Sequence, residues 1–461
     1  MTRTLVMKFG GTSVANAAAM RQVARITASA LETRCRIVLV VSAMAGVTDA
    51  LLAACEAASQ GSIAEVKARV LAIEARHQAV IDELFGGTPE AAWLWADVSA
   101  ELDDLRSVLT SVAVLRELTP RGADRVAASG ELMSSRIVAA LLSAVATPVR
   151  WVDARRVLVT DASFGAAQPL IDQTRLAALR EIAPALDAGE VAIVGGFAGA
   201  TVEGITTTLG RGGSDYSAAI LGAVLAAGEI QIWTDVDGML TADPCVVPGA
   251  VPVRHLSFDE ASELAYFGAK VLHPSTILPA IERNIPVRIL QTSRPDAPGS
   301  LISAAPPVHT RPLTAIACKR NITVVNVTST RMLLAHGFLR RVFEVFERHV
   351  TSVDVVTTSE VSVSMTLDDD RRIDLIARDL SAFASVQIER GMAIVSAVGD
   401  SLRLDPAIAV TVIAALGRIP LRMVSQAASR RNVTVVLSDV DVPAAMTRLH
   451  EEFFAPAEVG P

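Results

Sequence analysis

The chain has 461 residues, too many for one hydrophobic core, so two or three domains are expected. Apolar residues make up 51% of the sequence, which excludes a largely disordered chain, and the 4% aromatic content predicts cores built from Ala, Val, Leu and Ile. The net charge of −7 comes without a basic run, so we expect no nucleic-acid partner and expect an anionic substrate to be captured by a few placed cations.

The four cysteines are widely spaced and form no CxxC pair. This pattern argues against a disulfide framework or a zinc site and favours a reducing cytoplasm, where we expect the protein to lie. The N-terminus reaches Gly10 and Gly11 before the apolar core of a signal peptide could form. Apolar stretches such as Ile137–Ala146 are too short to span a bilayer, so no membrane partner is expected.

The first two-thirds of the chain alternates short β-branched runs with long Ala/Leu-rich stretches, a pattern typical of an α/β protein. Several runs are continuously apolar, as expected for parallel strands that are covered on both faces. The predicted strands are Leu5–Phe9, Ile37–Ser42, Val149–Asp153, Val191–Gly195, Ile230–Thr234 and Val287–Leu290. Between Gly61 and Leu118 no strand is predicted, which indicates an all-helical insertion such as a helical hairpin.

An irregular, proline-rich segment, Gln291–Pro312, marks the best domain boundary. Two β–α–β patterns follow it and indicate an internal duplication, so we predict a pair of small α+β modules. Their elements are strand Ile322–Val327, helix Gly337–Arg348 and strand Val361–Leu367, then strand Met392–Val398, helix Pro406–Leu416 and strand Val433–Leu437.

Two small-residue segments near the N-terminus each follow a predicted strand. In Lys8–Ser13, glycines let backbone N–H groups approach phosphate oxygens, and Lys8 adds a positive charge. Alone, a Gly-Gly turn after a strand more often only ends the strand and has no binding role. The P-loop pattern GxxxxGK[ST] is absent. In Ser42–Asp49, the alternative to a binding role is a helix N-cap provided by Thr48.

Two further segments add charged side chains. In Gly210–Asp215, Arg211 offers bidentate recognition of a carboxylate, and Asp215 can hold Mg²⁺ or orient a lysine. A solvated turn is the alternative, but we favour function for this segment. In Phe267–Pro274, Lys270 alone is more often a surface charge, and the histidine beside it is more often a helix-end or core residue.

Together these segments resemble the aspartokinases, members of the amino-acid kinase superfamily, over nearly the whole chain. KFGGTSV and GRGGSD together are highly specific for that family. The shared motifs are KFGGTSV at Lys8–Val14, SGELMS at Ser129–Ser134, TTTLGRGGSD at Thr206–Asp215, WTDVDG at Trp233–Gly238 and FGAKVLHP at Phe267–Pro274. The resemblance implies a carbamate-kinase-like α/β/α sandwich with a mainly parallel sheet over residues 1–295. It also implies two ferredoxin-like ACT modules, at residues 313–385 and 386–461. The last strand of the second module could complete the fold of the first.

The resemblance also implies roles for individual residues. Lys8 and Lys270 would contact the transferring phosphoryl group, and Asp215 would organise Lys8 and the Mg²⁺ of MgATP. Arg211 would bind the α-carboxylate of aspartate, and Glu131 its α-ammonium. The substrate-binding residues would be Ser42, Thr48, Glu131, Phe197, Arg211 and Ser214. The ATP-binding residues would be Lys8, Gly10, Gly11, Thr234, Asp235, Leu240, Asp243 and Lys270.

Two departures from the family lie in the nucleotide-side loop. Leu240 and Cys245 stand where many relatives have Tyr and Arg, which leaves the nucleotide affinity open.

The reaction itself needs few catalytic groups, because a side-chain carboxylate is already ionised at neutral pH and attacks phosphorus without a general base. Lysines, Mg²⁺ and helix N-termini can neutralise and align the two anionic reactants.

The C-terminal third resembles the first effector-binding module of lysine-sensitive aspartokinases. The effector residues implied are Met332, Phe338, Leu339, Ser352, Val353, Asp354, Thr358, Ser359 and Glu360. Asp354 and Glu360 would meet the two ammonium groups of lysine. The alternative is that Met332 and Phe338 are core residues and that the carboxylates are solvated strand ends.

The expected protein is an ATP- and Mg²⁺-dependent L-aspartate 4-phosphotransferase, inhibited by L-lysine, in the pathway to lysine, threonine and methionine. A homodimer or homotetramer formed through the ACT modules is expected. One alternative is a kinase for another carboxylate, such as an N-acetylated glutamate, but Glu131 argues against it because an acylated nitrogen carries no charge. The other is a catalytically silent amino-acid sensor, against which Lys8, Asp215 and Lys270 argue.

Overall fold

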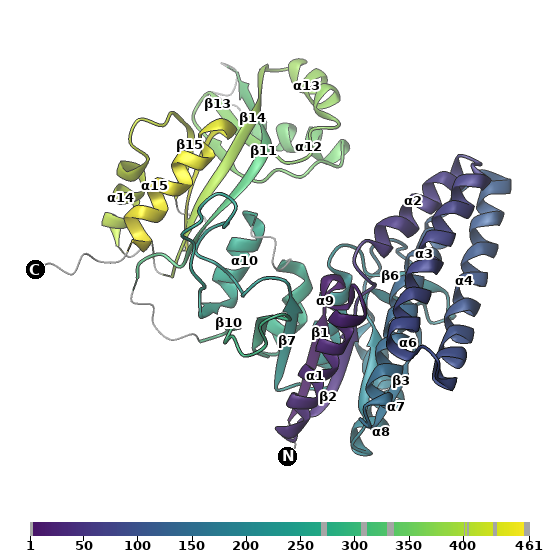
Figure 1. Ribbon diagram of the computed structural model, residues 1–461. Helices are drawn as coiled ribbons and strands as arrows, with labels where there is room; N and C mark the ends of the chain where they lie inside the picture. Colours follow the sequence, from purple (N-terminus) through teal and green to yellow (C-terminus); the bar gives the residue numbers. More distant parts are fainter. Residues whose placement is uncertain are drawn as a thin grey trace, which may run out of the picture. The chain divides into compact units, whose positions relative to one another are not determined.

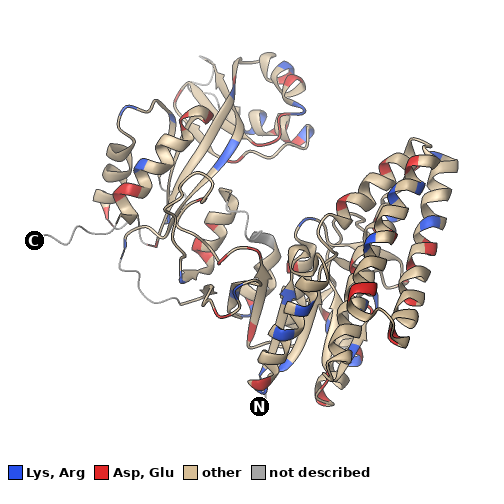
Figure 2. Cartoon of the chain, in the orientation of Figure 1, with Lys and Arg blue, Asp and Glu red and all other residues tan. Residues whose placement is uncertain are grey.

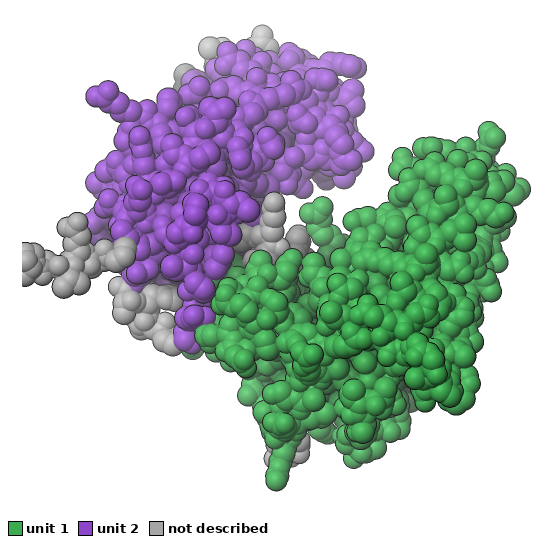
Figure 3. Space-filling view, viewed as in Figure 1, with its two compact units in different colours: residues 1–239, 271–306 green, residues 240–270, 307–461 purple. Residues whose placement is uncertain are grey.

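The computed structural model describes residues 3–268, 274–305, 311–329, 336–400, 402, 405–426 and 431–455. The chain forms two compact units, shown in different colours in Figure 3. Unit 1 contains residues 1–239 and 271–306, and unit 2 contains residues 240–270 and 307–461.

A mainly parallel sheet forms the centre of unit 1, with the strand order β3-β4-β2-β1-β7-β9-β10 (Figure 1). Its strands are β3 (Val149–Val152), β4 (Val191–Gly195), β2 (Arg36–Val41), β1 (Thr4–Phe9), β7 (Glu229–Thr234), β9 (Val287–Gln291) and β10 (Ser300–Ser303). Neighbours from β3 to β9 pair in parallel, and β10 pairs antiparallel with β9. The six strands predicted for this region are confirmed. Because their carboxyl ends meet at one edge, the loops that follow them converge there.

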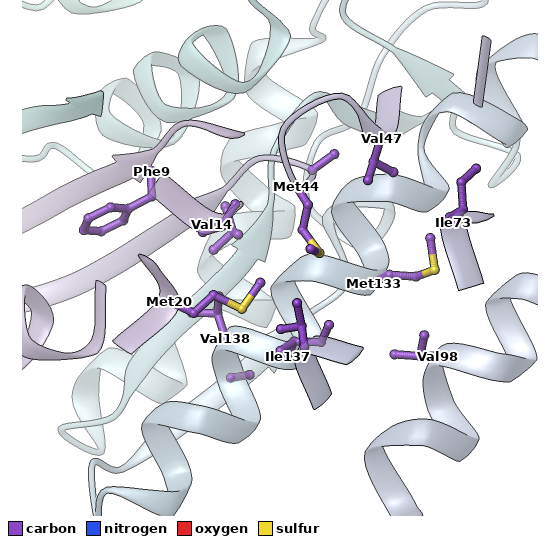
Figure 4. Close-up of a cluster of buried hydrophobic side chains, with 14 of the residues drawn as sticks. Phe9, Val14, Met20, Met44, Val47, Ile73, Val98, Met133, Ile137 and Val138 are labelled. Atoms are coloured by element: carbon purple, nitrogen blue, oxygen red, sulfur yellow. The ribbon is translucent and has the colours of Figure 1, made fainter. Parts of the chain in front are cut away.

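Helices cover both faces of this sheet. On one face, α1 (Ala17–Glu32) and α6 (Ser129–Ala144) share a core with Leu5, Met7 and Phe9 of β1, drawn in part in Figure 4. Successive side chains of a strand point to opposite faces, so Lys8 faces the other side, where α9 (Gly213–Val224) packs on β1. The predicted α/β/α layering is confirmed.

The predicted helical insertion is confirmed as two long helices, α3 (Ile63–Phe85) and α4 (Pro89–Leu115), which lie side by side in Figure 1. They pack against α2 (Val47–Ser59) and add to the same core. Figure 2 shows acidic and basic residues interspersed along both of them. The stretch Pro120–Ala144 is long and apolar enough to cross a membrane, but 83% of its apolar window is buried inside the protein, as in a core helix.

Unit 2 contains one antiparallel sheet with the strand order β12-β13-β11-β14-β16-β15. The strands are β12 (Val356–Thr358), β13 (Ser362–Leu367), β11 (Ala315–Thr328), β14 (Ser385–Val398), β16 (Asn432–Ser438) and β15 (Leu421–Gln426). The helices beside it are α12 (Phe338–Arg348), α13 (Ile373–Ser381), α14 (Pro406–Leu416) and α15 (Val442–Phe454). The predicted α+β character and all six predicted elements are confirmed, but the two modules share this sheet.

Two separate cores lie along the sheet of unit 2. Val325 and Val327 of β11 pack with α12 and α13, whereas Ile316, at the other end of β11, packs with α14 and α15. β11 and β14 have 14 residues each and pair along their length, so both strands cross both cores. A division at residue 385 therefore falls at the start of a strand that serves both modules.

The compact units also differ from the predicted limit of the catalytic domain at residue 295. Residues 240–270 belong to unit 2, because Ala242 and Val247 are buried in the core beside α14 and α15. This segment includes α10 (Phe258–Tyr266), and Asn432 of β16 donates a hydrogen bond of 2.7 Å to Glu263 of that helix.

Candidate active site

A pocket of about 670 Å³ opens in unit 1 at the carboxyl ends of β1 and β2. The predicted substrate residues and two of the three predicted catalytic residues line it. These are Lys8, Ser42, Thr48, Glu131, Phe197, Arg211, Ser214 and Asp215, together with Gly11. The third predicted catalytic residue, Lys270, lies outside the described residues. The structure therefore brings together groups from five separate segments of unit 1.

An ion pair between Lys8 and Asp215 lies at the base of this pocket. Lys8 is the last residue but one of β1, and Asp215 lies in the first turn of α9, with 2.6 Å between Nζ and Oδ1. The two side chains are only 10% and 16% exposed, so water screens the pair weakly. An ammonium has three N–H donors, so Lys8 retains donors for a second anion. A Cβ on Gly10, directly after the strand, would lie 3.5 Å from this Nζ, in van der Waals contact with it.

Glu131 supplies a buried carboxyl group from the first turn of α6. Burial raises the pKa of Glu131 to about 8, although backbone hydrogen bonds from Ala43 and Glu131 and the charge of Lys8 oppose the rise. Within the described part of the chain, its Oε2 has no hydrogen-bond partner. Because an unpaired buried oxygen is costly, this atom is suited to receive a cationic donor from a ligand.

The loop that carries Arg211 depends on glycine at several positions. Gly210 and Gly212 have φ values of +77° and +71°, in the left-handed region that glycine adopts without strain. A Cβ on Gly213 would lie 2.5 Å from Cδ2 of Phe197, so glycine is required for α9 to begin this close to that ring. Arg211 is exposed at the pocket, and its guanidinium has no ion pair among the described residues. It is free to bind an anion.

Phe197 has a strained backbone beside this loop. Its φ is +63°, which is uncommon for a residue with a side chain and occurs preferentially at functional sites. The conformation is held by two hydrogen bonds: its N–H donates to Oγ of Ser217 (2.9 Å), and its carbonyl accepts from the N–H of Leu209 (3.0 Å). The predicted pocket position of Phe197 is thus enforced by its neighbours.

Asp124 also lines the pocket and was not predicted from the sequence. It lies on α5 (Pro120–Ala127), is 2% exposed, and accepts hydrogen bonds from Gly165 and Thr208. These partners are 41 and 84 residues away in the sequence, so no local motif signals the residue.

The predicted nucleotide residues are divided between the two units. Thr234 ends β7 and Asp235 follows it in unit 1. Both line a smaller cavity of about 340 Å³ together with Thr12, Ser13 and Thr292. Leu240 and Asp243 lie in unit 2, and Lys270 lies outside the described residues. The assembly of a complete nucleotide site from these residues stays a prediction.

The described residues contain no cluster of three or more His, Cys, Asp or Glu side chains that could hold a metal alone. In phosphoryl-transfer sites, however, Mg²⁺ is typically held by one or two carboxylates and the substrate phosphates. Asp215 is such a carboxylate, because it faces the pocket beside Lys8. The residues present fit a Mg²⁺ ion that arrives with a nucleotide.

Most predicted effector residues lie around β12 in unit 2. Ser352, Val353 and Asp354 precede β12, Thr358 ends it, and Ser359 and Glu360 form the turn that follows. Phe338 and Val353 pack in one core, and Leu339, next on α12, is exposed. Met332 lies outside the described residues.

The two predicted effector carboxylates differ in their surroundings. Asp354 is already engaged: Lys319 donates to it from 2.9 Å, and the hydroxyl of Tyr266 donates from 3.2 Å. Its side chain is 6% exposed. Glu360 is exposed and has no ion pair among the described residues, so it is the more accessible of the two for a cationic ligand.

Comparisons with known proteins agree with this geometry. A model of the amino acid kinase family matches residues 3–291, and an ACT domain model matches residues 395–453. The chain is 39% identical to the chloroplastic aspartokinase 3 of Arabidopsis thaliana, covering 98% of this chain and 82% of the relative. It is 36% identical to the lysine-sensitive aspartokinase 3 of Escherichia coli, covering 98% and 100%.

Two solved structures of E. coli aspartokinase III also resemble the whole chain. The complex with aspartate and ADP matches with a TM-score of 0.85 at 35% identity, covering 98% of this chain and 100% of the other. The complex with lysine and aspartate matches with a TM-score of 0.81 at 35% identity, covering 98% and 99%.

Proposed function

The chain belongs to the aspartokinases of the amino acid kinase family, and we propose that it transfers the γ-phosphoryl group of ATP to the side-chain carboxylate of L-aspartate. The product is 4-phospho-L-aspartate, from which lysine, threonine and methionine are made. The observation that carries the proposal is the single pocket in which Lys8, Asp215, Arg211 and Glu131 converge.

The chemistry needs positioning and charge neutralisation. An oxygen of the aspartate side chain forms a bond to the γ-phosphorus while the bond from that phosphorus to the bridging oxygen breaks, and ADP leaves. The attacking carboxylate is ionised at neutral pH, so no side chain has to remove a proton. Lys8 donates hydrogen bonds to the oxygens of the transferred group, and Asp215 holds the ammonium in place. Mg²⁺ bound with ATP would neutralise phosphate charge, with Asp215 as the carboxylate able to hold it.

Selection of aspartate rests on two opposite charges in the pocket. The guanidinium of Arg211 is proposed to bind the α-carboxylate, and the carboxylate of Glu131 the α-ammonium. Both groups lack a protein ion-pair partner among the described residues. The α-carboxylate and the α-ammonium of an amino acid would supply these two partners. A carboxylate substrate with an acylated nitrogen has no positive charge, so it would leave the buried Oε2 of Glu131 without a cationic donor, which is costly.

The direct test is turnover. With MgATP and L-aspartate, the protein is expected to release ADP and to form an acyl phosphate that hydroxylamine traps as a hydroxamate. Removing Mg²⁺ with a chelator should abolish the reaction. Hydroxamate formation from N-acetyl-L-glutamate but not from L-aspartate would contradict the proposal, and so would the absence of any turnover.

The pH dependence of aspartate use is expected to report Glu131. Because the pKa of Glu131 is raised to about 8, the free enzyme holds this carboxyl protonated at neutral pH and ionises it only as the pH rises further. The ionised form pairs with the substrate ammonium, so kcat/KM for aspartate should rise with pH and level off above about pH 8. In Glu131→Gln this rise should be absent, because the amide does not titrate.

Stability gives an independent check on the same group. In the folded protein the carboxyl of Glu131 stays protonated up to about pH 8, because its pKa is raised to that value. In the unfolded chain it ionises above the ordinary pKa of 4.5, so the fold loses stability as the pH rises from about 4.5 to 8. Thermal melts across that range should show Glu131→Gln gaining stability relative to wild type. If the difference in melting temperature between Glu131→Gln and wild type were the same at every pH, the raised pKa of Glu131 would be contradicted.

We also propose that L-lysine inhibits the enzyme by binding at the effector residues around β12. The lysine-sensitive relative and the solved structure of E. coli aspartokinase III with lysine and aspartate support this proposal. An ACT domain model also matches residues 395–453 of the same unit. Inhibition requires that lysine bind a less active arrangement of the protein more tightly than the active one. The supporting local feature is Glu360, an exposed carboxylate that forms no ion pair with the residues that the structure describes.

Glu360→Gln is therefore expected to raise the lysine concentration for half-inhibition by about thirtyfold, because losing one charged contact costs about 2 kcal/mol. The measurement is a lysine titration at fixed aspartate and ATP. Glu347→Gln, an exposed carboxylate change on α12, is the matched control and should leave the titration unchanged. A wild-type enzyme that ignores lysine at tens of millimolar would overturn the effector assignment and leave the kinase assignment standing.

Assembly and location stay predictions. We propose a homodimer or homotetramer formed through the ACT modules, which sedimentation or light scattering would measure. A cytoplasmic location is proposed as well, and fractionation of the source cells would test it.

A further inference from the structure

Asp124 joins three separate segments behind the substrate pocket. Its Oδ2 accepts hydrogen bonds from the backbone N–H groups of Gly165 (3.0 Å) and Thr208 (2.9 Å), and its Oδ1 accepts from the hydroxyl of Thr208 (2.7 Å). Thr208 ends β6 (Thr206–Thr208), and Gly165 lies in the loop that precedes α7 (Ile171–Glu181). One buried carboxylate therefore holds a strand end and a loop.

The helix that carries Asp124 is itself firmly anchored. The next residue, Arg125, pairs with Glu101 of α4 at 2.5 Å and with Asp104 of the same helix at 3.1 Å. At the start of α5, the side chain of Thr119 accepts a hydrogen bond of 3.1 Å from the N–H of Gly122. Because α5 is held in place by these contacts, the hydrogen bonds of Asp124 position Gly165 and Thr208 rather than α5 itself.

Both partners of Asp124 determine where the Arg211 loop begins. Gly210 follows Thr208 by two residues, and a Cβ on Gly210 would lie 3.2 Å from the carbonyl oxygen of Gly165. The N–H of Ala167 donates to the carbonyl of Thr208 (2.9 Å), which joins the same two segments a second time. The backbone that leads into Arg211 is therefore packed on the loop that Asp124 holds.

Arg211 needs this support because it has little of its own. Its side chain is exposed, without an ion-pair partner among the described residues, and it lies between two glycines in the left-handed region. A glycine-flanked arginine is held weakly by its own backbone. Bidentate binding of a carboxylate, in contrast, requires a fixed direction of approach.

We propose that Asp124 is a positioning residue for substrate recognition: by holding Gly165 and Thr208 it places Arg211 to bind the α-carboxylate of aspartate. The inference rests on the proposed function, since it deepens the account of the same pocket. Asp124 acts through Arg211 and needs no contact with the substrate.

The test begins with Asp124→Ala and Asp124→Asn. Asp124→Ala leaves two backbone N–H groups without acceptors, and it is expected to raise KM for aspartate about tenfold while KM for ATP changes less than about twofold. Asp124→Asn retains one carbonyl acceptor, so a smaller rise in the same KM is expected. If the alanine variant does not fold in a thermal melt, the asparagine variant carries the test.

The matched control is Asp161→Ala. Asp161 lies in the same loop and also accepts three hydrogen bonds, from the N–H of Gln168 and from the N–H and hydroxyl of Ser163, but it does not line the pocket. The control should leave KM for aspartate near the wild-type value. An equal rise in both variants would show a general loosening of the loop and would overturn the inference.

The decisive measurement is a double-mutant cycle with Arg211→Ala. If Asp124 acts through Arg211, its substitution in the Arg211→Ala background should change KM for aspartate by less than about twofold. Multiplicative effects of the two changes would overturn the inference while leaving the kinase assignment intact. A wild-type protein that does not phosphorylate aspartate would contradict the proposed function and this inference with it.

Discussion

Replacing Lys8 by Ala is expected to lower kcat by about a hundredfold or more and to change KM for aspartate much less. The side chain of Lys8 is 10% exposed and its ammonium lies 2.6 Å from Asp215, so it is fixed in place before the reaction begins. Charge develops on the oxygens of the phosphoryl group during transfer, and a donor that requires no reorganisation stabilises that charge most. Its loss therefore raises the barrier rather than weakening substrate binding.

Steady-state kinetics with both substrates varied would measure this effect. Lys67→Ala, on the exposed surface of α3, is a matched control that removes the same kind of side chain away from the pocket. The control should retain wild-type kcat. Near-normal turnover by a folded Lys8→Ala protein would remove Lys8 from the catalytic residues.

Replacing Arg211 by Ala is expected to raise KM for aspartate by about fiftyfold while nucleotide binding persists. The reason is the loss of a charge-assisted pair with the α-carboxylate, which typically contributes about 2 to 3 kcal/mol. Because this carboxylate does not react, its binding changes little between ground state and transition state, so kcat should fall less than KM rises.

Binding measurements with ADP would separate the two substrates. Arg175→Ala, on α7 with its guanidinium 3.7 Å from Asp172, is the control for loss of an arginine outside the pocket. If Arg211→Ala lost nucleotide affinity and retained aspartate binding, the substrate end of the pocket would be assigned wrongly.

Six strands of unit 1 were predictable because each is a short, mostly apolar run between turn residues. β5 (Ala198–Ala200) and β6 were missed because three residues are too few to show a hydrophobic period, although the threonines of β6 favour a strand. β10 was missed because it lies in the proline-rich segment that was predicted to be irregular. In unit 2, the full length of β11 was missed because Lys319, Arg320 and Asn321 interrupt its apolar pattern. The pairing with β14 shifts register there, which lets the strand continue through a polar stretch.

The pocket was predictable where motifs follow strands, because the carboxyl ends of parallel strands meet at one edge of the sheet. This rule brings Lys8 and Ser42 together in the described structure. It does not place the Arg211 loop, because that loop follows β6, which pairs antiparallel with β5 in a separate two-stranded sheet. It does not reach Asp124, whose role depends on partners far away in the sequence. It also does not reveal that Lys319 already occupies the carboxylate of Asp354, because that pair forms across the sheet of unit 2.

The strands β11 and β14 make the regulatory half of the chain indivisible. Residues 315–319 of β11 pair with β14 and not with β13 in the described sheet. A fragment ending at residue 384 would therefore keep β11 but leave one whole edge of it, rich in Ile and Val, without a partner. Bare strand edges of this kind recruit other chains, so such a fragment would be prone to aggregate. We therefore expect the two modules to fold only when they are expressed together.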